Sequence, residues 1–359
     1  MVLYINGNFL NEPLTGVQLY AAAIIRQIDL LLGGPGFAGF HEVVLLMPKG
    51  TECPLLLQHI RIKAGGFGQG NLWEQTSLSL MSRGELLINL CNRAPLFKFR
   101  QLLVIHDASI IATPEGFSWR FRLFWGICYL IFGQTLPGFA TVSAFSRQEL
   151  QKYFKIPRAK INVIYPGVER LLGKEADNEL LDKLAIGGRR YVLAVGGNKN
   201  KNLQIIISAL SRLPSDLLLV IAGKYEKITP LALNPKVISA GRVTDEGLVA
   251  LYKGATCLAF PSLYEGFGLP PIEAMSLGCP VVAAKRSSIP EVCGEAALYC
   301  DPENENDVVE KIELLLGDTT LVVSLVQRGR ERAAFFSATR AVEGLGQAIE
   351  KIVVRDDKL

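Results

Sequence analysis

The stretch CLAFPSLYEGFGLPPIEAM, residues 257–275, contains a strand, a loop and a helix start in immediate succession. The apolar run CLAFPS predicts a buried strand, and the glycine-bearing LYEGFG predicts a loop. Two adjacent prolines then suit the first turn of a helix, where the missing N–H costs nothing. Glu265 therefore lies in the loop, and Glu273 lies within about one turn of the helix start.

Two carboxylates on either side of such a junction suit a ligand with a phosphate between two hydroxyl-bearing groups. Backbone N–H groups of the loop and the helix start favour the phosphate. Glu265 and Glu273 can then accept hydrogen bonds from hydroxyls at each end, as a nucleotide-sugar provides them. The alternative is that both glutamates only complement the positive end of a helix dipole.

The same alternation of short apolar runs and helical segments extends along the chain. Runs between helical segments favour buried parallel strands, and hence doubly wound α/β domains. The strands are expected at 2–6, 42–47, 85–90, 102–106, 139–143, 190–197, 216–223, 236–243, 257–262 and 280–284. The helices are expected at 16–32, 202–213, 245–255 and 339–354.

A Pro-Gly turn followed by charged residues, VIYPGVERLLGKEADNE at 163–179, predicts a linker. The expected organisation is an N-terminal acceptor-binding domain over 1–168 and a C-terminal nucleotide-sugar domain over 169–338. Residues 339–359 form a terminal helix that closes back toward the N-terminal domain. Two such sheets are expected to face a cleft, with ligands beyond the carboxyl ends of the strands.

Composition excludes several classes of protein. With 359 residues, 49% hydrophobic and 20% charged, the chain is not intrinsically disordered. Its seven scattered cysteines include no C-x-x-C pair, which disfavours a disulfide framework or a zinc site and favours a reducing compartment. The opening MVLYIN has no charged segment before it and is typical of a first strand rather than a signal peptide.

The charge is unevenly distributed. Residues 1–168 hold 15 Lys and Arg against 9 Asp and Glu, whereas the remainder holds 23 against 25. Ordinary variation is one interpretation, and attraction to an anionic surface such as lipid headgroups is the other. No basic run with interleaved aromatic residues indicates nucleic-acid binding.

The most apolar segment is LFWGICYLIFG, residues 123–133. It is shorter than the ~20 residues that a spanning helix needs, so it is either a buried helix or an interfacial one. The interfacial interpretation depends on two arginines and four aromatic residues, namely Arg120, Arg122, Phe124, Trp125, Tyr129 and Phe132.

The segment SLYEGFGLPPIEAMSLGCPVVAA resembles the E-x7-E signature of family 4 glycosyltransferases, which have the GT-B fold. Further segments match the family in the same order over nearly the whole chain: VIHDASI, TVSAFSRQEL, VIYPGV, GRVTDEGLVALYKGA and SSIPEVCGEAALYCDPEN.

The resemblance implies a role for each matching residue. Glu265 corresponds to the glutamate that contacts the donor sugar, Glu273 to the one that holds the ribose, and Lys201 to the lysine that neutralises the diphosphate. The backbone of Phe267, Gly268 and Leu269 would meet the sugar and the diphosphate. The remaining correspondences are Gly16 near the phosphates, His106 near the sugar, and Gly241, Arg242 and Val243 beside the base.

Each assignment has a structural alternative. Lys201 and Arg242 would then be solvated surface residues, and His106 a satisfied core histidine. Asp107 would be a turn or cap residue, and Gly16 a tight turn.

The sequence also departs from the family pattern. Asn200 and Leu19 occupy positions where many relatives carry arginine, which weakens the expected diphosphate clamp. The tryptophan that often precedes the terminal helix is absent from FFSATRA. No D-x-D motif is present, so no metal is expected, and the donor takes the place of a cofactor.

The resemblance implies a retaining hexosyltransferase of cell-surface polysaccharide synthesis. It would use a nucleotide-diphosphate sugar, with GDP-mannose favoured, and a glycan or lipid-linked acceptor. The expected location is the cytoplasm, with peripheral contact at the inner face of an anionic plasma membrane. The alternatives are a catalytically weak or inactive nucleotide-sugar-binding protein with the GT-B fold and a sugar-nucleotide epimerase. A Rossmann oxidoreductase is disfavoured because no G-x-G-x-x-G follows the first strand.

Overall fold

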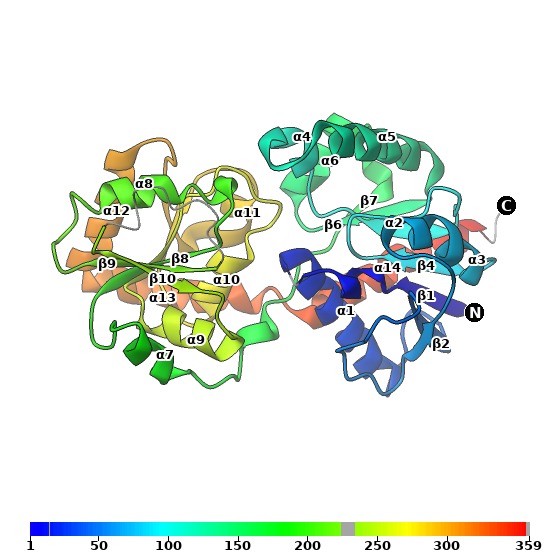
Figure 1. Cartoon of the computed structure of the whole chain (residues 1–359), viewed down its shortest axis with the longest axis horizontal. Helices are drawn as coiled ribbons and strands as arrows, with labels where there is room; N and C mark the ends of the chain where they lie inside the picture. Colours follow the sequence, from blue (N-terminus) through cyan, green and yellow to red (C-terminus); the bar gives the residue numbers. More distant parts are fainter. Residues whose placement is uncertain (14, 224–233, 357–359) are drawn as a thin grey trace. The chain divides into compact units, whose positions relative to one another are not determined.

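The computed structural model describes residues 1–13, 15–223 and 234–356. The chain divides into two compact units (Figure 1). The first unit combines Met1–Gly167 with Ser337–Leu359, and the second is Val168–Phe336. Each unit is built on its own parallel sheet.

The first unit's sheet has seven strands within the described residues, in the order β3-β2-β1-β4-β5-β6-β7. Continuous apolar runs form its centre, where every residue of β4 and β5 is buried. The strands are β1 Val2–Asn6, β2 Glu42–Met47, β3 Arg61–Ala64, β4 Leu86–Asn89, β5 Gln101–Val104, β6 Gly138–Thr141 and β7 Ile161–Val163.

Helices cover both faces of this sheet. A core of buried side chains from β5, β6, α5 and α6 includes Leu103, Phe139, Trp125 and Phe154. The last helix, α14, packs beside α1 and against β6, although the second unit separates it from both in sequence. The helices are α1 Gly16–Leu32, α2 Gly70–Trp73, α3 Ser79–Met81, α4 Ser109–Ala112, α5 Trp119–Thr135, α6 Ala144–Phe154 and α14 Ala338–Asp356.

The second unit's sheet has six strands within the described residues, in the order β10-β9-β8-β11-β12-β13. The strands are β8 Tyr191–Val195, β9 Leu218–Ala222, β10 Val237–Gly241, β11 Cys257–Phe260, β12 Val281–Ala284 and β13 Leu298–Cys300. The helices are α7 Asn178–Lys183, α8 Leu203–Ala209, α9 Asp245–Gly254, α10 Leu269–Ser276, α11 Ile289–Cys293, α12 Glu305–Gly317 and α13 Thr319–Ala334.

Both strand orders reverse next to the first strand of the sheet. The chain moves from β1 outward in one direction and returns to place β4 on the other side, and β8 and β11 repeat this arrangement. In open parallel sheets, ligands bind beyond the carboxyl ends of the strands at this reversal. The fold therefore identifies the residues just after β8 and β11, and just after β1 and β4, as site candidates.

The predicted α/β class with two Rossmann-like sheets is confirmed. The predicted first helix at 16–32 coincides with α1, while the helix predicted at 202–213 is shorter and ends at Ala209. Three short strands, β3, β7 and β13, were not expected. The cleft between the two domains stays a prediction.

Candidate functional site

The residues after β8 and β11 meet at the reversal of the second unit's sheet. Lys201 ends a short 3₁₀ turn that follows β8, and Glu265 lies in the loop after β11. The Lys201 Nζ is 2.7 Å from Glu265 Oε1, which also accepts a hydrogen bond of 2.7 Å from the Ser262 hydroxyl. The ammonium also lies 4.5 Å from the centre of the Phe260 ring. A cation and a carboxylate are thus fixed where a ligand is expected to bind.

Two serines fix the backbone of the Glu265 loop. The Ser288 hydroxyl lies 2.9 Å from the carbonyl oxygens of Glu265 and Phe267, and it is completely buried. The Glu265 amide donates to Ser287 Oγ at 3.1 Å. These hydrogen bonds anchor the loop to the segment after β12, and they fix the direction of its amide groups.

Glycine is required at two points of this site. Gly268 precedes α10 with a φ of 96°, and a Cβ there would come within 2.5 Å of Ile289 Cδ1. Gly196, directly after β8, has a φ of 95°, and a Cβ there would approach Lys201 Cε to 2.9 Å. Because glycine has no Cβ, Gly268 allows the turn into α10, and Gly196 leaves room for the Lys201 side chain.

Glu273, on α10, is almost completely buried and hydrogen-bonded on both oxygens. Its Oε1 accepts from Arg170, at 2.7 Å from Nη2 and 3.2 Å from Nε. Its Oε2 accepts from the Tyr252 hydroxyl at 3.3 Å. Burial, followed by the Glu273 charge, raises the pKa of Tyr252 well above its usual value, so the hydroxyl remains a donor. The carboxylate is held in one orientation by these partners.

Arg170 lies three residues after Gly167, where the chain enters the second unit. Its guanidinium also pairs with Asp245 at the start of α9. Burial alone lowers the pKa of Arg170, but the charges of Glu273 and Asp245 more than offset this and raise it overall. Arg170 therefore stays charged and links α9 to α10.

The segment expected beside the base connects β10 to α9. Gly241 ends β10 with a φ of 62°, and its carbonyl oxygen accepts from Gly223 N at 2.6 Å. Arg242 is exposed and Val243 is half-buried, and neither contributes to the contact between Lys201 and Glu265. The segment thus follows the carboxyl end of β10, at the same end of the sheet as the residues after β8 and β11, although β9 lies between β10 and β8.

Gly16 belongs to the first unit, where it begins α1. The preceding residue, Thr15, donates its amide to the Gln18 side chain at 3.2 Å, and Gln18 donates to Glu12 at 3.0 Å. These bonds fix the first turn of the helix. Leu14 lies outside the described residues.

His106 follows β5 and is buried. Its Nε2 is 2.9 Å from the Leu90 carbonyl oxygen, and its ring packs edge-on against Tyr20. Burial lowers the pKa of the imidazole, so at neutral pH the ring is uncharged and Nε2–H donates to Leu90. These contacts agree with the core-histidine interpretation. Asp107 accepts from the Ser109 amide at 2.8 Å, two residues further on, as in an Asx turn just before α4.

A buried polar cluster occupies the reversal of the first unit's sheet, and sequence analysis gave it no role. Asn6, at the end of β1, donates to Asn89 at the end of β4 and to Glu74, at 3.0 and 3.1 Å. Four buried side-chain oxygens have no hydrogen-bond partner among the described residues: Asn8 Oδ1, Tyr20 OH, Glu74 Oε2 and Ser79 Oγ. Burial raises the pKa of Glu74, although hydrogen bonds from Asn6 and Asn8 oppose the shift.

Replacing Glu74 with glutamine is expected to stabilise the first unit at neutral pH. Because the folded-state pKa of Glu74 is raised, the folded protein binds the proton more tightly than the unfolded chain, so stability falls as pH rises above the unfolded value. The gain in melting temperature, ~2–4 °C for each kcal/mol, should disappear toward acidic pH. Thermal melts over a pH series measure this, with the exposed Glu115→Gln as control. A glutamine variant less stable at every pH would contradict it.

The segment expected to be a buried or an interfacial helix is α5, which is buried along one side and exposed along the other. Trp125, Tyr129 and Phe132 are buried in the core, which corrects their assignment to an interfacial surface. Phe124 is 46% exposed. Among the described helices, none is both long and apolar enough to cross a membrane.

The described residues show no evident metal-binding site. They contain no group of three or more His, Cys, Asp or Glu side chains that is arranged to hold an ion. The seven cysteines are free thiols, and five of them are buried. Metal independence stays a prediction.

The structure brings together Lys201, Glu265 and the loop of Phe267, Gly268 and Leu269, with Glu273 one helical turn further on. Gly16 and His106 belong to the other unit. Sequence reasoning missed five residues that hold this arrangement: Arg170, Tyr252, Ser262, Ser287 and Ser288. The only signal for Arg170 was its place two residues after the YPGV segment.

Comparison with known proteins shows which families and folds the chain resembles. Residues 177–332 match the family model of group 1 glycosyl transferases. The chain is 30% identical over 213 residues to O-antigen chain mannosyltransferase B of Escherichia coli, covering 55% of this chain and 56% of that protein. It is 28% identical over 235 residues to O-antigen chain mannosyltransferase RfbU of Salmonella typhimurium, covering 60% and 61%.

A solved structure with the same fold is Anabaena Alr3699/HepE in complex with UDP-glucose. It superimposes with a TM-score of 0.73 at 18% identity and covers the whole of both chains. The chain thus has the GT-B fold and resembles family 4 glycosyltransferases, in particular bacterial mannosyltransferases of surface polysaccharide synthesis. The match spans little more than half the length of the curated relatives.

Proposed function

We propose that this protein is a retaining glycosyltransferase that moves a hexose, mannose in the first instance, from a nucleotide-diphosphate sugar to an acceptor hydroxyl. The observation that carries the proposal is the pairing of Lys201 with Glu265 at the sheet reversal, next to the buried Glu273. The match of residues 177–332 to group 1 glycosyl transferases supports the same reaction.

Each residue has a defined part in the proposed reaction. As the bond to the anomeric carbon breaks, negative charge grows on the leaving diphosphate. Lys201 and the amides around Gly268 provide the preorganised positive potential that stabilises it. Glu265 then exchanges its bond with Lys201 for a sugar hydroxyl, and Glu273 holds the ribose. A leaving phosphate oxygen accepts the acceptor's proton on the same face of the sugar, so no metal and no carboxylate nucleophile take part.

The proposal extends to donor, acceptor and location. GDP-mannose is favoured as donor because several relatives, including O-antigen chain mannosyltransferases B and RfbU, are named as mannosyltransferases. The acceptor is a glycan or lipid-linked sugar in cell-surface polysaccharide synthesis. The proposed location is the cytoplasm, in peripheral contact with the inner face of the plasma membrane. The basic first half of the sequence supports this contact.

Thermal shift with GDP, UDP and ADP, each with and without EDTA, tests the donor site. A nucleotide at 100 times its Kd adds about 2.7 kcal/mol of stability. We expect GDP to stabilise the wild type with EDTA present, and the shift to disappear in Glu273→Ala. The exposed Glu310→Ala on α12 is the matched control and should keep the shift.

Transfer from GDP-mannose to a glycan acceptor then separates an enzyme from a binding protein. Nucleotide binding without any transfer would favour the inactive nucleotide-sugar-binding protein, in which Asn200 and Leu19 have weakened the diphosphate clamp. A shift that EDTA abolishes would contradict metal independence. Stabilisation by UDP rather than GDP would replace the proposed donor.

A further inference from the structure

The outward side of α5 is apolar, which is unusual for a solvent-facing helix. Six residues at helical spacing form this outer face: Trp119, Leu123, Phe124, Ile127, Leu130 and Ile131. Their exposed fractions run from 42% for Ile131 to 66% for Trp119. The opposite side of the helix is also apolar, because it packs into the core of the first unit. A helix that is apolar all round is normally buried on all sides.

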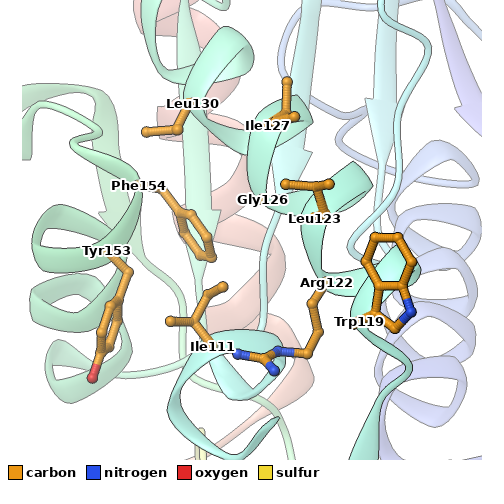
Figure 2. A pocket seen from close by; sticks show the side chains of 9 residues that line it. All are labelled: Ile111, Trp119, Arg122, Leu123, Gly126, Ile127, Leu130, Tyr153 and Phe154. Atoms are coloured by element: carbon orange, nitrogen blue, oxygen red, sulfur yellow. The ribbon is translucent and has the colours of Figure 1, made fainter.

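A groove extends this apolar surface toward α6 (Figure 2). Its volume is about 440 Å³. Leu123, Ile127 and Leu130 form one wall along α5, Phe154 comes from α6, and Ile111 closes one end from α4. The outer face and the groove together form one continuous apolar surface, larger than scattered exposed residues produce.

The charges of α5, of α6 and of the segment after α6 have one sign almost throughout. Residues 119–160 contain seven Lys and Arg and a single acidic residue, Glu149. Two arginines lie on α5 itself. The Arg120 guanidinium is 5.4 Å from the centre of the Trp119 ring. Arg122 donates through Nε to the Ile110 carbonyl oxygen at 3.0 Å, which holds its guanidinium at the edge of the groove.

The basic residues of the following segment have few acidic partners. Lys155 and Arg158 are exposed, and neither makes an ion pair with another described residue. Among the described residues, Lys152 has one acidic partner, Glu149, at 3.9 Å. Such an array of cations beside apolar side chains is typical of helices that lie in the headgroup region of an anionic bilayer.

We propose that the outer face of α5, with the groove beside it, docks on the surface of a bilayer that contains anionic lipid. The apolar side chains enter the boundary between headgroups and hydrocarbon, and the groove receives part of a lipid chain. Lys155, Arg158 and the two arginines of α5 face lipid phosphates. Charge complementarity selects the anionic bilayer over an uncharged apolar partner. The inference rests on the proposed function for its setting, but the binding itself needs no sugar transfer.

Flotation of the full chain with phosphatidylcholine vesicles, with and without phosphatidylglycerol, tests this surface. We expect the wild type to float only with the anionic vesicles. The triple variant Trp119→Ser, Phe124→Ser, Ile127→Ser should lose at least about tenfold in partitioning. A matched control replaces three other exposed apolar residues of the same unit, Leu30, Phe67 and Leu72, with serine and should float as the wild type does.

The charge requirement has its own test. Lys155→Glu and Arg158→Glu should each weaken partitioning by more than about fivefold, because loss of one basic residue near an anionic surface removes about 1 kcal/mol and the added glutamate is repelled. Raising the salt concentration should weaken wild-type binding in the same direction. Lys49→Glu, an exposed lysine after β2, is the control and should have no comparable effect.

Three results would overturn the proposal. One is a wild type that floats with neither vesicle, and another is a triple variant that floats as well as the wild type. The third is a concentration-dependent dimer, seen by light scattering, that the triple variant abolishes, because a second copy of the chain would then cover the face. The GDP-induced thermal shift in each variant reports folding. If GDP caused no thermal shift in the wild type, the donor assignment would be wrong, but the flotation result would still stand.

Discussion

Replacing Lys201 with alanine is expected to lower kcat of the proposed transfer by about 10²–10³-fold. The ammonium is the charged side chain held nearest to Glu265, at the point where the diphosphate is expected. No other described lysine or arginine pairs with Glu265, so the developing charge would be left with backbone amides alone. The loss should appear in kcat more than in nucleotide affinity, because the cation stabilises charge that grows only in the transition state.

The matched control is Lys199→Ala, two residues earlier in the same 3₁₀ turn. Lys199 is exposed, and its removal should change kcat by less than about threefold, as expected for a surface residue away from the site. Steady-state kinetics with GDP-mannose give both constants, and thermal melts exclude unfolding. Since the Ser262 hydroxyl still binds Glu265 in Lys201→Ala, the fold should persist. Equal activity of the two variants would remove Lys201 from the mechanism.

The sheets were predictable because their central strands are continuous apolar runs. In the second unit, LLLVIA and CLAF are buried on both faces and could be identified from composition alone. The missed strands lack this signal. β3 consists of RIKA at the edge of its sheet and is exposed throughout, while β7 and β13 are only three residues long. Pairing with a neighbouring strand, rather than hydrophobicity, makes these segments strands.

Only part of the site was predictable, because some of its contacts join residues that are far apart in the sequence. Glu265 and Glu273 stand out locally because a loop and two prolines separate them. The partners of Glu273 do not stand out in the sequence, since Arg170 is 103 residues away and Tyr252 is 21 residues away. Their contact arises when α9 and α10 pack at the same edge of the sheet. Hydrophobicity likewise could not decide which side of α5 faces the core, because both sides are apolar.

Replacing Arg170 with methionine is expected to destabilise the second unit by about 3–5 kcal/mol. The change removes two hydrogen bonds from Glu273, whose side chain is only 6% exposed, and leaves a buried carboxylate with Tyr252 as its remaining partner. Methionine replaces the aliphatic stem of the arginine side chain, so the main loss is the charged guanidinium and its hydrogen bonds. The GDP-induced thermal shift should also shrink, because Glu273 would no longer be held toward the ribose.

A double variant distinguishes loss of the charge pair from general disruption. Arg170→Met combined with Glu273→Gln leaves no unpaired charge on α10 and should recover most of the lost stability, since neutral replacements of buried pairs are often tolerated. Lys174→Met is the control from the same network. Its lysine pairs with Glu246 at 2.7 Å but is 35% exposed, so the cost should stay below about 1 kcal/mol.

The measurement must report on the second unit alone. All three tryptophans, Trp73, Trp119 and Trp125, belong to the first unit, so their fluorescence does not follow it. Hydrogen exchange of peptides that cover α9 and α10 reports directly on the stability of the second unit. Faster exchange in Arg170→Met than in Lys174→Met, restored in the double variant, is the expected result. If exchange in Arg170→Met matched the wild type, Glu273 would be held without its arginine, and the chain's entry into the second unit would have no energetic link to the donor site.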